Sequence, residues 1–186
     1  HTWFFTFADV ESARLLLPDY SEFYRSLDGI WKFHWVGNPE ERSTEFYKPS
    51  FDVSTWDEVT VPMQWNVAGI QKDGSLKYGT PIYANQPVIF QHTVAVDDWK
   101  GGVMRTPPHD WVTYKHRNEV GAYRRNFEIP ATWENREVYL NFDGVSSFFY
   151  LWVNGHYIGF SKNSRNTSSF CITPYLNWNG KNTVAV

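Results

Sequence analysis

The chain of 186 residues is long enough for one domain with a substantial hydrophobic core. Its formal net charge of −3 provides no general attraction to nucleic-acid phosphates or to anionic membrane surfaces. No apolar run approaches the roughly 20 residues that span a bilayer. We therefore expect a globular chain that binds neither nucleic acid nor membrane.

The first 28 residues predict an arm that packs on the outside of the following domain. The stretch "VESARLLLPDYSEF" has a short helical pattern that Pro18 interrupts. The chain begins with His1 rather than methionine and ends in the strand-like "NTVAV". Both ends predict a fragment of a larger, multidomain protein.

From Gly29 to Val186 the sequence predicts short strands separated by turns, with no long helical period. The strand-like stretches are "DGIWKFHWV", "WDEVTVP", "VIFQHTVAV", "GAYRRNFEIP", "REVYLNF", "SSFFYLWV", "YIGFS", "SSFCIT" and "NTVAV". This pattern favours an all-β domain, an antiparallel sandwich such as a jelly roll.

Three local patterns sharpen this expectation. In "REVYLNF", Val138, Leu140 and Phe142 alternate with polar neighbours, as in a half-buried strand. In "SSFFYLWV", the residues after the two serines are apolar or aromatic on both faces of the strand. We therefore expect both faces to be covered. Asn154-Gly155 follows directly and predicts a tight hairpin.

The aromatic content of 19%, with ten Trp, fits a large core and equally a surface that recognises sugars, because pyranose C–H faces pack on flat rings. The single cysteine, Cys171, excludes a disulfide framework. Because Cys171 lies in the apolar stretch "SSFCIT", we expect a buried, unreactive thiol.

Residues 97–118 predict a long surface insertion, since they are polar, rich in Gly and Pro, and without periodicity. The insertion contains His109-Asp110, a weak metal-ligand pair, and two Trp side chains, Trp99 and Trp111. Phosphate-binding loops, the H-E-x-x-H pattern and the G-x-S-x-G nucleophile motif are absent from the sequence. Asn118-Glu119 looks like a glycosidase acid/base pair, but we interpret Glu119 as part of a turn that enters the next strand.

The stretch "YGTPIYANQP", residues 78–87, predicts a structured loop, because its prolines fix φ and remove backbone donors. The loop is either a rigid corner or a support that presents Asn85.

The whole chain resembles the N-terminal sugar-binding domain of glycoside hydrolase family 2, and most closely that of bacterial β-galactosidases. The motifs that carry the resemblance occur in the family's order: "YRSLDGIWKFHW", "FDVSTWDEVTVPMQWNVAGI", "YGTPIYANQP", the run from "NEVGAYRRNF" to "GFSKNSR", and "SSFCITPYLNWNGKNTVAV".

The resemblance implies a galactose-binding-domain-like jelly roll within a retaining β-galactosidase whose two catalytic glutamates lie in a following barrel domain. This chain alone should then be inactive, with no catalytic residue. Asn85 falls where the family places an asparagine that binds the galactosyl group, and Gln86 falls at the next position of that pocket, where relatives can carry an apolar residue. The parent should be a homo-oligomer. Its location in a bacterium could be either the cytoplasm or the periplasm.

The resemblance also bears on cofactors. Mg²⁺ and Na⁺ are candidate cofactors of the parent enzyme. However, Lys162 replaces a glutamine that ligates magnesium in some relatives, and an acidic residue of the sodium site would lie after Val186. We therefore expect no metal and no cofactor in this chain.

Two alternatives to the galactosidase interpretation stay open. The chain could be an autonomous carbohydrate-binding module, or a purely structural or oligomer-forming sandwich.

Overall fold

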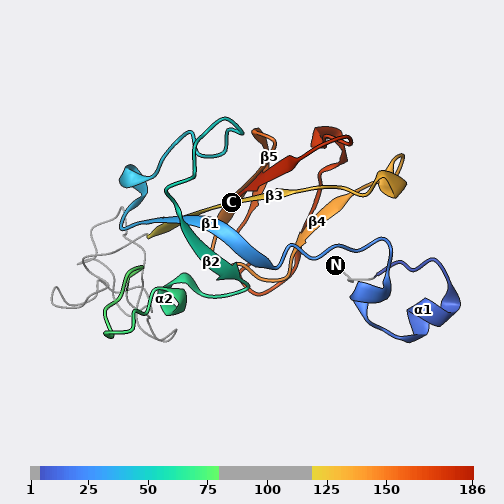
Figure 1. The fold of residues 1–186 in the computed structure, drawn as a ribbon, viewed down its shortest axis with the longest axis horizontal. Coiled ribbons are helices and arrows are strands. Elements are labelled where there is room, and N and C mark those ends of the chain that lie inside the picture. Colours follow the sequence, from blue (N-terminus) through green and yellow to red (C-terminus); the bar gives the residue numbers. More distant parts are fainter. Residues whose placement is uncertain (1–4, 80–118) are drawn as a thin grey trace, which may run out of the picture. The chain divides into compact units, whose positions relative to one another are not determined.

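The computed structural model describes residues 5–79 and 119–186. Strands dominate these residues, and the helices are short (Figure 1). The strands are β1 (Gly29–Val36), β2 (Asp57–Val61), β3 (Val120–Phe127), β4 (Tyr139–Phe142), β5 (Phe149–Val153), β6 (His156–Ser161), β7 (Ser168–Cys171) and β8 (Asn182–Ala185). The helices are α1 (Val10–Arg14) and α2 (Trp65–Ala68), with 3₁₀ turns at Pro18–Tyr20, Pro39–Glu41, Ala131–Trp133 and Thr173–Tyr175.

Six strands form one sheet in the order β2-β1-β3-β8-β5-β6, and β4 pairs with β7 in a second sheet. The chain divides into two compact units. Of the described residues, the first unit holds 5–29, 45–52 and 124–186, and the second holds 30–44, 53–79 and 119–123. The predicted antiparallel β-sandwich, the jelly-roll class, is confirmed. The predicted strand at "VIFQHTVAV" and the predicted insertion at 97–118 lie outside the described residues.

The core of the first unit lies between the two sheets. Val138 and Ile172 beside the small sheet pack with Val153 of β5 and with Trp133. Phe170 of β7 and Ile158 of β6 extend this cluster. The predicted alternation in residues 137–142 is confirmed, because Val138 is buried, Leu140 and Phe142 are partly buried, and their polar neighbours are exposed.

The hairpin between β5 and β6 turns at Asn154-Gly155, as predicted. Both residues have positive φ, +51° and +83°, which a two-residue type I′ turn requires. The side-chain Nδ2 of Asn154 also donates to Asn182 Oδ1 at 2.7 Å, and Asn154 Oδ1 accepts from the backbone amide of Thr183 at 2.8 Å. Asn182, fully buried, donates in turn to the Asn177 carbonyl. This network satisfies buried amide groups that would otherwise destabilise the fold.

Two predictions about burial are wrong. Cys171 is exposed, because it pairs with the exposed Tyr139 while Phe170 and Ile172, on either side, point into the core. The outer face of β5 is only partly covered, since Phe148 and Tyr150 are 45% and 48% exposed. A strand with apolar residues at every position therefore does not guarantee two buried faces.

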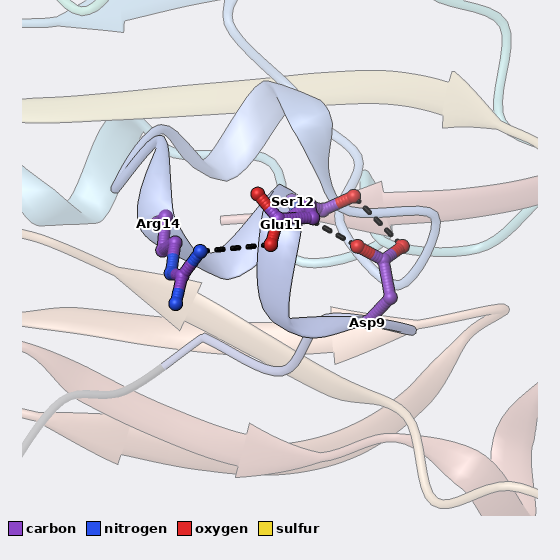
Figure 2. A network of polar contacts seen from close by, with 4 residues as sticks. All are labelled: Asp9, Glu11, Ser12 and Arg14. Carbon is purple, nitrogen blue, oxygen red and sulfur yellow. Dashed lines mark hydrogen bonds and ion pairs between the residues drawn. The ribbon is translucent and has the colours of Figure 1, made fainter.

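Helix α1 confirms the short helical pattern of the N-terminal segment. The Asp9 carboxylate accepts from the Ser12 amide at 2.8 Å and from the Ser12 hydroxyl at 2.9 Å, which caps the helix (Figure 2). These bonds lower the pKa of Asp9. Arg14 donates to Glu11 one turn away, also at 2.8 Å. No residue of α1 is buried, so local capping and pairing maintain this single turn. None of the helices in the described ranges is long and apolar enough to cross a membrane.

Candidate functional site

The predicted substrate-binding residues, Asn85 and Gln86, lie outside the described residues, as do His109-Asp110, Trp99 and Trp111. The structure does describe the residues on both sides of this segment, at Tyr78-Gly79 and at Glu119-Val120. We call these four residues and the side chains that they contact in the second unit the loop base. The loop base is the described part of the molecule that adjoins the segment with the predicted site in the sequence.

Tyr78 anchors the loop base in the core of the second unit. Its ring is 6% exposed and meets Phe33 of β1 edge to face, with the ring centroids 4.9 Å apart. Val59 of β2 completes the buried cluster, and Trp65 and Tyr123 pack against it. The first residue of the stretch "YGTPIYANQP" is therefore a core residue, a role that the loop-like composition of the stretch did not predict.

Polar contacts fix the same residue from the other side. The Tyr78 hydroxyl donates to the Asp57 carboxylate, and Lys77 Nζ lies 2.5 Å from Asp57 Oδ1. Burial and the bond to Asp57 raise the pKa of Tyr78 well above its ordinary value. Burial alone would raise the pKa of Asp57, but the bonds from Lys77 and Tyr78 outweigh it and lower this pKa. Asp57 therefore stays ionised and holds two successive residues at the start of the segment.

Gly79 and Glu119 bring the two ends of the segment together. Gly79 has φ of +73°, a conformation that favours glycine. A Cβ at Gly79 would lie only 2.3 Å from Glu119 Oε1, so the Glu119 carboxylate sits directly over the glycine. Glu119 immediately precedes β3, the place predicted for a turn entering that strand. The described residues at the two ends of the segment that contains Asn85 thus lie side by side.

Two further glycines allow the close packing under the loop base. A Cβ at Gly69 would lie 2.8 Å from the Tyr78 amide nitrogen. A Cβ at Gly121 would lie 2.7 Å from both the Phe33 and the Trp65 rings. Both glycines therefore permit contacts that any larger residue would prevent. The sequence contained them in "VAGI" and "VGAY", but it held no signal for what they approach.

Within residues 5–79 and 119–186, no group of three or more His, Cys, Asp or Glu side chains could hold a metal ion. Lys162, which stands at the position of a magnesium-binding glutamine in the resemblance, is exposed just after β6. The loop base consists instead of rings, the Asp57–Lys77 pair, the Glu119 carboxylate and tightly packed glycines. Such an arrangement can position a loop.

Tyr78→Phe should change how stability depends on pH. Because the folded state raises the pKa of Tyr78 above 10.0, the folded state favours the protonated hydroxyl. The free energy of unfolding should therefore be fully retained below pH 10 and should fall as the pH rises above that value. Tyr78→Phe removes this titration, so the alkaline loss should be smaller, while the variant loses about 1 kcal/mol at neutral pH with the hydrogen bond.

Urea unfolding at neutral pH and at several alkaline pH values measures this difference. Tyr20→Phe serves as the control for the loss of a tyrosine hydroxyl, because Tyr20 is 59% exposed. Burial also raises the pKa of Tyr123, so a residual alkaline loss should persist in Tyr78→Phe and be smaller in the double variant with Tyr123→Phe. An alkaline loss of the same size in Tyr78→Phe and the unsubstituted chain would contradict the prediction.

Comparison with curated proteins identifies relatives over most of the chain. A β-galactosidase of Priestia megaterium is 35% identical over 166 residues, which cover 89% of this chain and 14% of the relative. A β-galactosidase of Clostridium acetobutylicum is 34% identical over the full 186 residues, 18% of its own length. A β-galactosidase large subunit of Leuconostoc lactis is 32% identical, with 25% of its length covered. The chain thus spans a quarter or less of these relatives.

Solved structures give the same fold. A β-glucuronidase of Bacteroides uniformis superposes with a TM-score of 0.54 over 87% of this chain and 14% of its own, at 20% identity. The family described as glycosyl hydrolases family 2, sugar binding domain, matches residues 24–186. From the fold, the ordered motifs and this match, the chain belongs to glycosyl hydrolase family 2, in its sugar-binding domain.

Proposed function

We propose that this chain is the non-catalytic N-terminal domain of a β-galactosidase and that it contributes Asn85 to the pocket for the galactosyl group. The observation that supports this most strongly is the family match over residues 24–186, together with β-galactosidase relatives that are 34% and 35% identical over most of the chain. The likeness to β-glucuronidase structures concerns the fold alone.

Asparagine suits the role proposed for it. Its amide offers two donors and an acceptor, which match sugar hydroxyls that both donate and accept. Its neutrality leaves the pKa values of nearby catalytic carboxylates undisturbed, and a retaining glycosidase depends on keeping those values apart. Gln86, the next residue, is proposed as a second contact in the same pocket.

The loop base supports the proposal by the way it holds the start of the loop. Tyr78 is buried and bonded to Asp57, and Gly79 lies against Glu119. Asn85 follows only a few residues later, after Pro81. A loop fixed at its origin loses less conformational freedom on binding, so more of the hydrogen-bond energy appears as affinity.

Hydrolysis itself is assigned to a following barrel domain that supplies the two glutamates, in a homo-oligomeric parent. The purified 186-residue chain should therefore release no galactose from a galactoside. Galactose release by this chain, free of contaminating enzyme, would overturn the assignment.

Asn85→Ala in the full-length enzyme should lower kcat/KM for a galactoside by at least about tenfold, or about 1.4 kcal/mol of transition-state stabilisation. The loss reflects a hydrogen bond to the sugar that strengthens in the transition state. Steady-state kinetics with a small chromogenic galactoside measures the effect.

Asn141→Ala provides the matched control, because Asn141 is an exposed asparagine on β4 and should leave kcat/KM unchanged. Gln86→Ala tests the neighbouring contact in the same assay. If Asn85→Ala retains the kcat/KM of the unsubstituted enzyme, the domain does not contribute this residue to the pocket, and the structural sandwich becomes the better interpretation.

A further inference from the structure

The dipeptide Asn-Gly occurs twice in the sequence, at Asn154-Gly155 and at Asn179-Gly180. In such a pair the backbone nitrogen of the glycine can attack the side-chain Cγ of the asparagine, because glycine has no Cβ to hinder the approach. The attack requires a backbone amide without a hydrogen bond and a side chain that can turn towards it. The same dipeptide is therefore stable at one place in a fold and reactive at another.

The first pair is held by hydrogen bonds on both polar atoms of its asparagine side chain. Asn154 Nδ2 donates to the Tyr175 carbonyl at 2.8 Å and to Asn182 Oδ1 at 2.7 Å, and Oδ1 accepts from the Thr183 amide at 2.8 Å. The Asn154 backbone amide donates to the Thr183 carbonyl, also at 2.8 Å. Rotation of the side chain towards Gly155 would break all of its bonds at once, so the fold protects this pair.

The second pair lies in the turn between the 3₁₀ turn Thr173–Tyr175 and β8, where Asn179 is exposed. Within residues 5–79 and 119–186, neither the Asn179 side chain nor the Gly180 backbone amide has a hydrogen-bond partner. Only the Asn179 backbone amide is bonded, to Asn177 Oδ1 at 3.3 Å. The Asn179 side chain can therefore turn towards the Gly180 amide without losing a contact.

We propose that Asn179 is a site of spontaneous deamidation and that Asn154 is protected from this reaction. The Gly180 nitrogen forms a bond to Asn179 Cγ, its proton passes through solvent to Nδ2, and Nδ2 leaves as ammonia. The product is a cyclic succinimide. Water then adds to either ring carbonyl and opens the ring to isoaspartate or aspartate. Water is the only co-reactant, and the proposal depends neither on Asn85 nor on β-galactosidase activity.

The modified residue lies beside the contacts that fix the start of β8. Asn182 is fully buried, and its Nδ2 donates to the Asn177 carbonyl at 3.0 Å and to the Gly180 carbonyl at 3.3 Å. Asn182 Oδ1 accepts from the Asn177 amide at 2.7 Å. Isoaspartate lengthens the main chain before Gly180 by one methylene, and either product adds a negative charge. Conversion therefore loosens the loop around a buried amide and lowers the stability of the chain.

Incubation of the folded 186-residue chain in mildly alkaline buffer, followed by peptide mass spectrometry, tests the proposal. Asn179 should convert at least about tenfold faster than Asn154, because Asn154 must first break its hydrogen bonds. In urea that unfolds the chain, the two rates should agree within about threefold, since the fold then protects neither residue. Ion exchange separates the more acidic converted chain, which should unfold at a lower urea concentration than the unconverted chain.

Asn179→Gln is the matched control, because glutamine keeps the amide but would have to close a larger ring, which is a slower reaction. This variant should form no acidic product at position 179 and should leave Asn154 intact. Conversion of Asn154 as fast as Asn179 in the folded chain would overturn the proposal. So would an Asn179 that reacts only in urea, or a tenfold difference that persists in urea, because neighbouring residues rather than the fold would then cause it. Equal urea midpoints of the converted and unconverted chains would overturn the proposed loosening of β8.

Discussion

Phe33→Ala should lower the free energy of unfolding by about 3–5 kcal/mol. The Phe33 side chain is completely buried in β1, with ring centroids 4.6 Å from Tyr123 and 4.9 Å from Tyr78. Its removal leaves a cavity directly beneath the loop base, and the neighbouring rings can fill it only in part. Denaturation in urea, followed by circular dichroism, measures the loss.

Ile30→Ala is the control for this variant. Ile30 lies on the same strand but is 56% exposed, so its loss should change stability by no more than about 0.5 kcal/mol. Gly121→Ala offers a second test, because its added methyl group would collide with the Phe33 ring. Phe33→Ala and Gly121→Ala together should therefore destabilise the chain less than the sum of their separate effects. A loss below about 1 kcal/mol for Phe33→Ala would show that the cluster is loosely packed.

The sequence predicted the fold well where local patterns decide it. The segment "GIWKFHWV" forms β1 and "DEVTV" forms β2, and Asn154-Gly155 makes the predicted hairpin. Alternation along residues 137–142 correctly assigned the buried face of β4. In each case the signal lies within a few residues, because strand period and turn chemistry are properties of the local backbone.

The predictions failed where distant residues determine burial. Apolar neighbours suggested that Cys171 is buried. Because side chains alternate along β7, Cys171 instead lies on the exposed face, where it pairs with Tyr139. On the outer face of β5, the sequence could not indicate that Trp152 would be more covered than Tyr150, since its cover comes from Phe46 and Tyr47, about a hundred residues earlier.

The candidate site shows the same difference between local patterns, which the sequence reveals, and contacts between distant residues, which it does not. Asn85 and Gln86 came from a motif, and the motif gave no information about the packing that supports the two ends of their segment. That support depends on Tyr78 meeting Asp57 and on Gly79 meeting Glu119, and the second pair is 40 positions apart in the sequence. Such contacts depend on the order and pairing of the strands. The sequence predicted the class of fold but not that strand order.

Arg124→Ala should also destabilise the chain strongly, by about 2–4 kcal/mol. Arg124 of β3 is 5% exposed, and burial lowers its pKa. Its Nη1 donates to the Phe46 carbonyl and, at 3.0 Å, to the Lys48 carbonyl. Without the guanidinium these carbonyls lose their charged donor, and residues 46–48 are released from the face of the sheet, so that Trp152 loses the ring packed on it. Urea unfolding and hydrogen exchange of residues 45–52 measure the two effects.

Arg124→Lys and Arg25→Ala complete the experiment. Lysine keeps the charge but lacks the planar fork of donors, so it should recover only part of the stability. Arg25 is exposed and donates to the neighbouring Tyr24 carbonyl, so Arg25→Ala should change stability by no more than about 0.5 kcal/mol. Arg124→Met tests whether the side chain only fills space. If this variant were as stable as the unsubstituted chain and kept slow hydrogen exchange at residues 45–52, the hydrogen bonds of Arg124 would not be needed and the prediction would be wrong. If the guanidinium is instead what holds this segment, methionine should behave like alanine in exchange, whatever stability its side chain recovers.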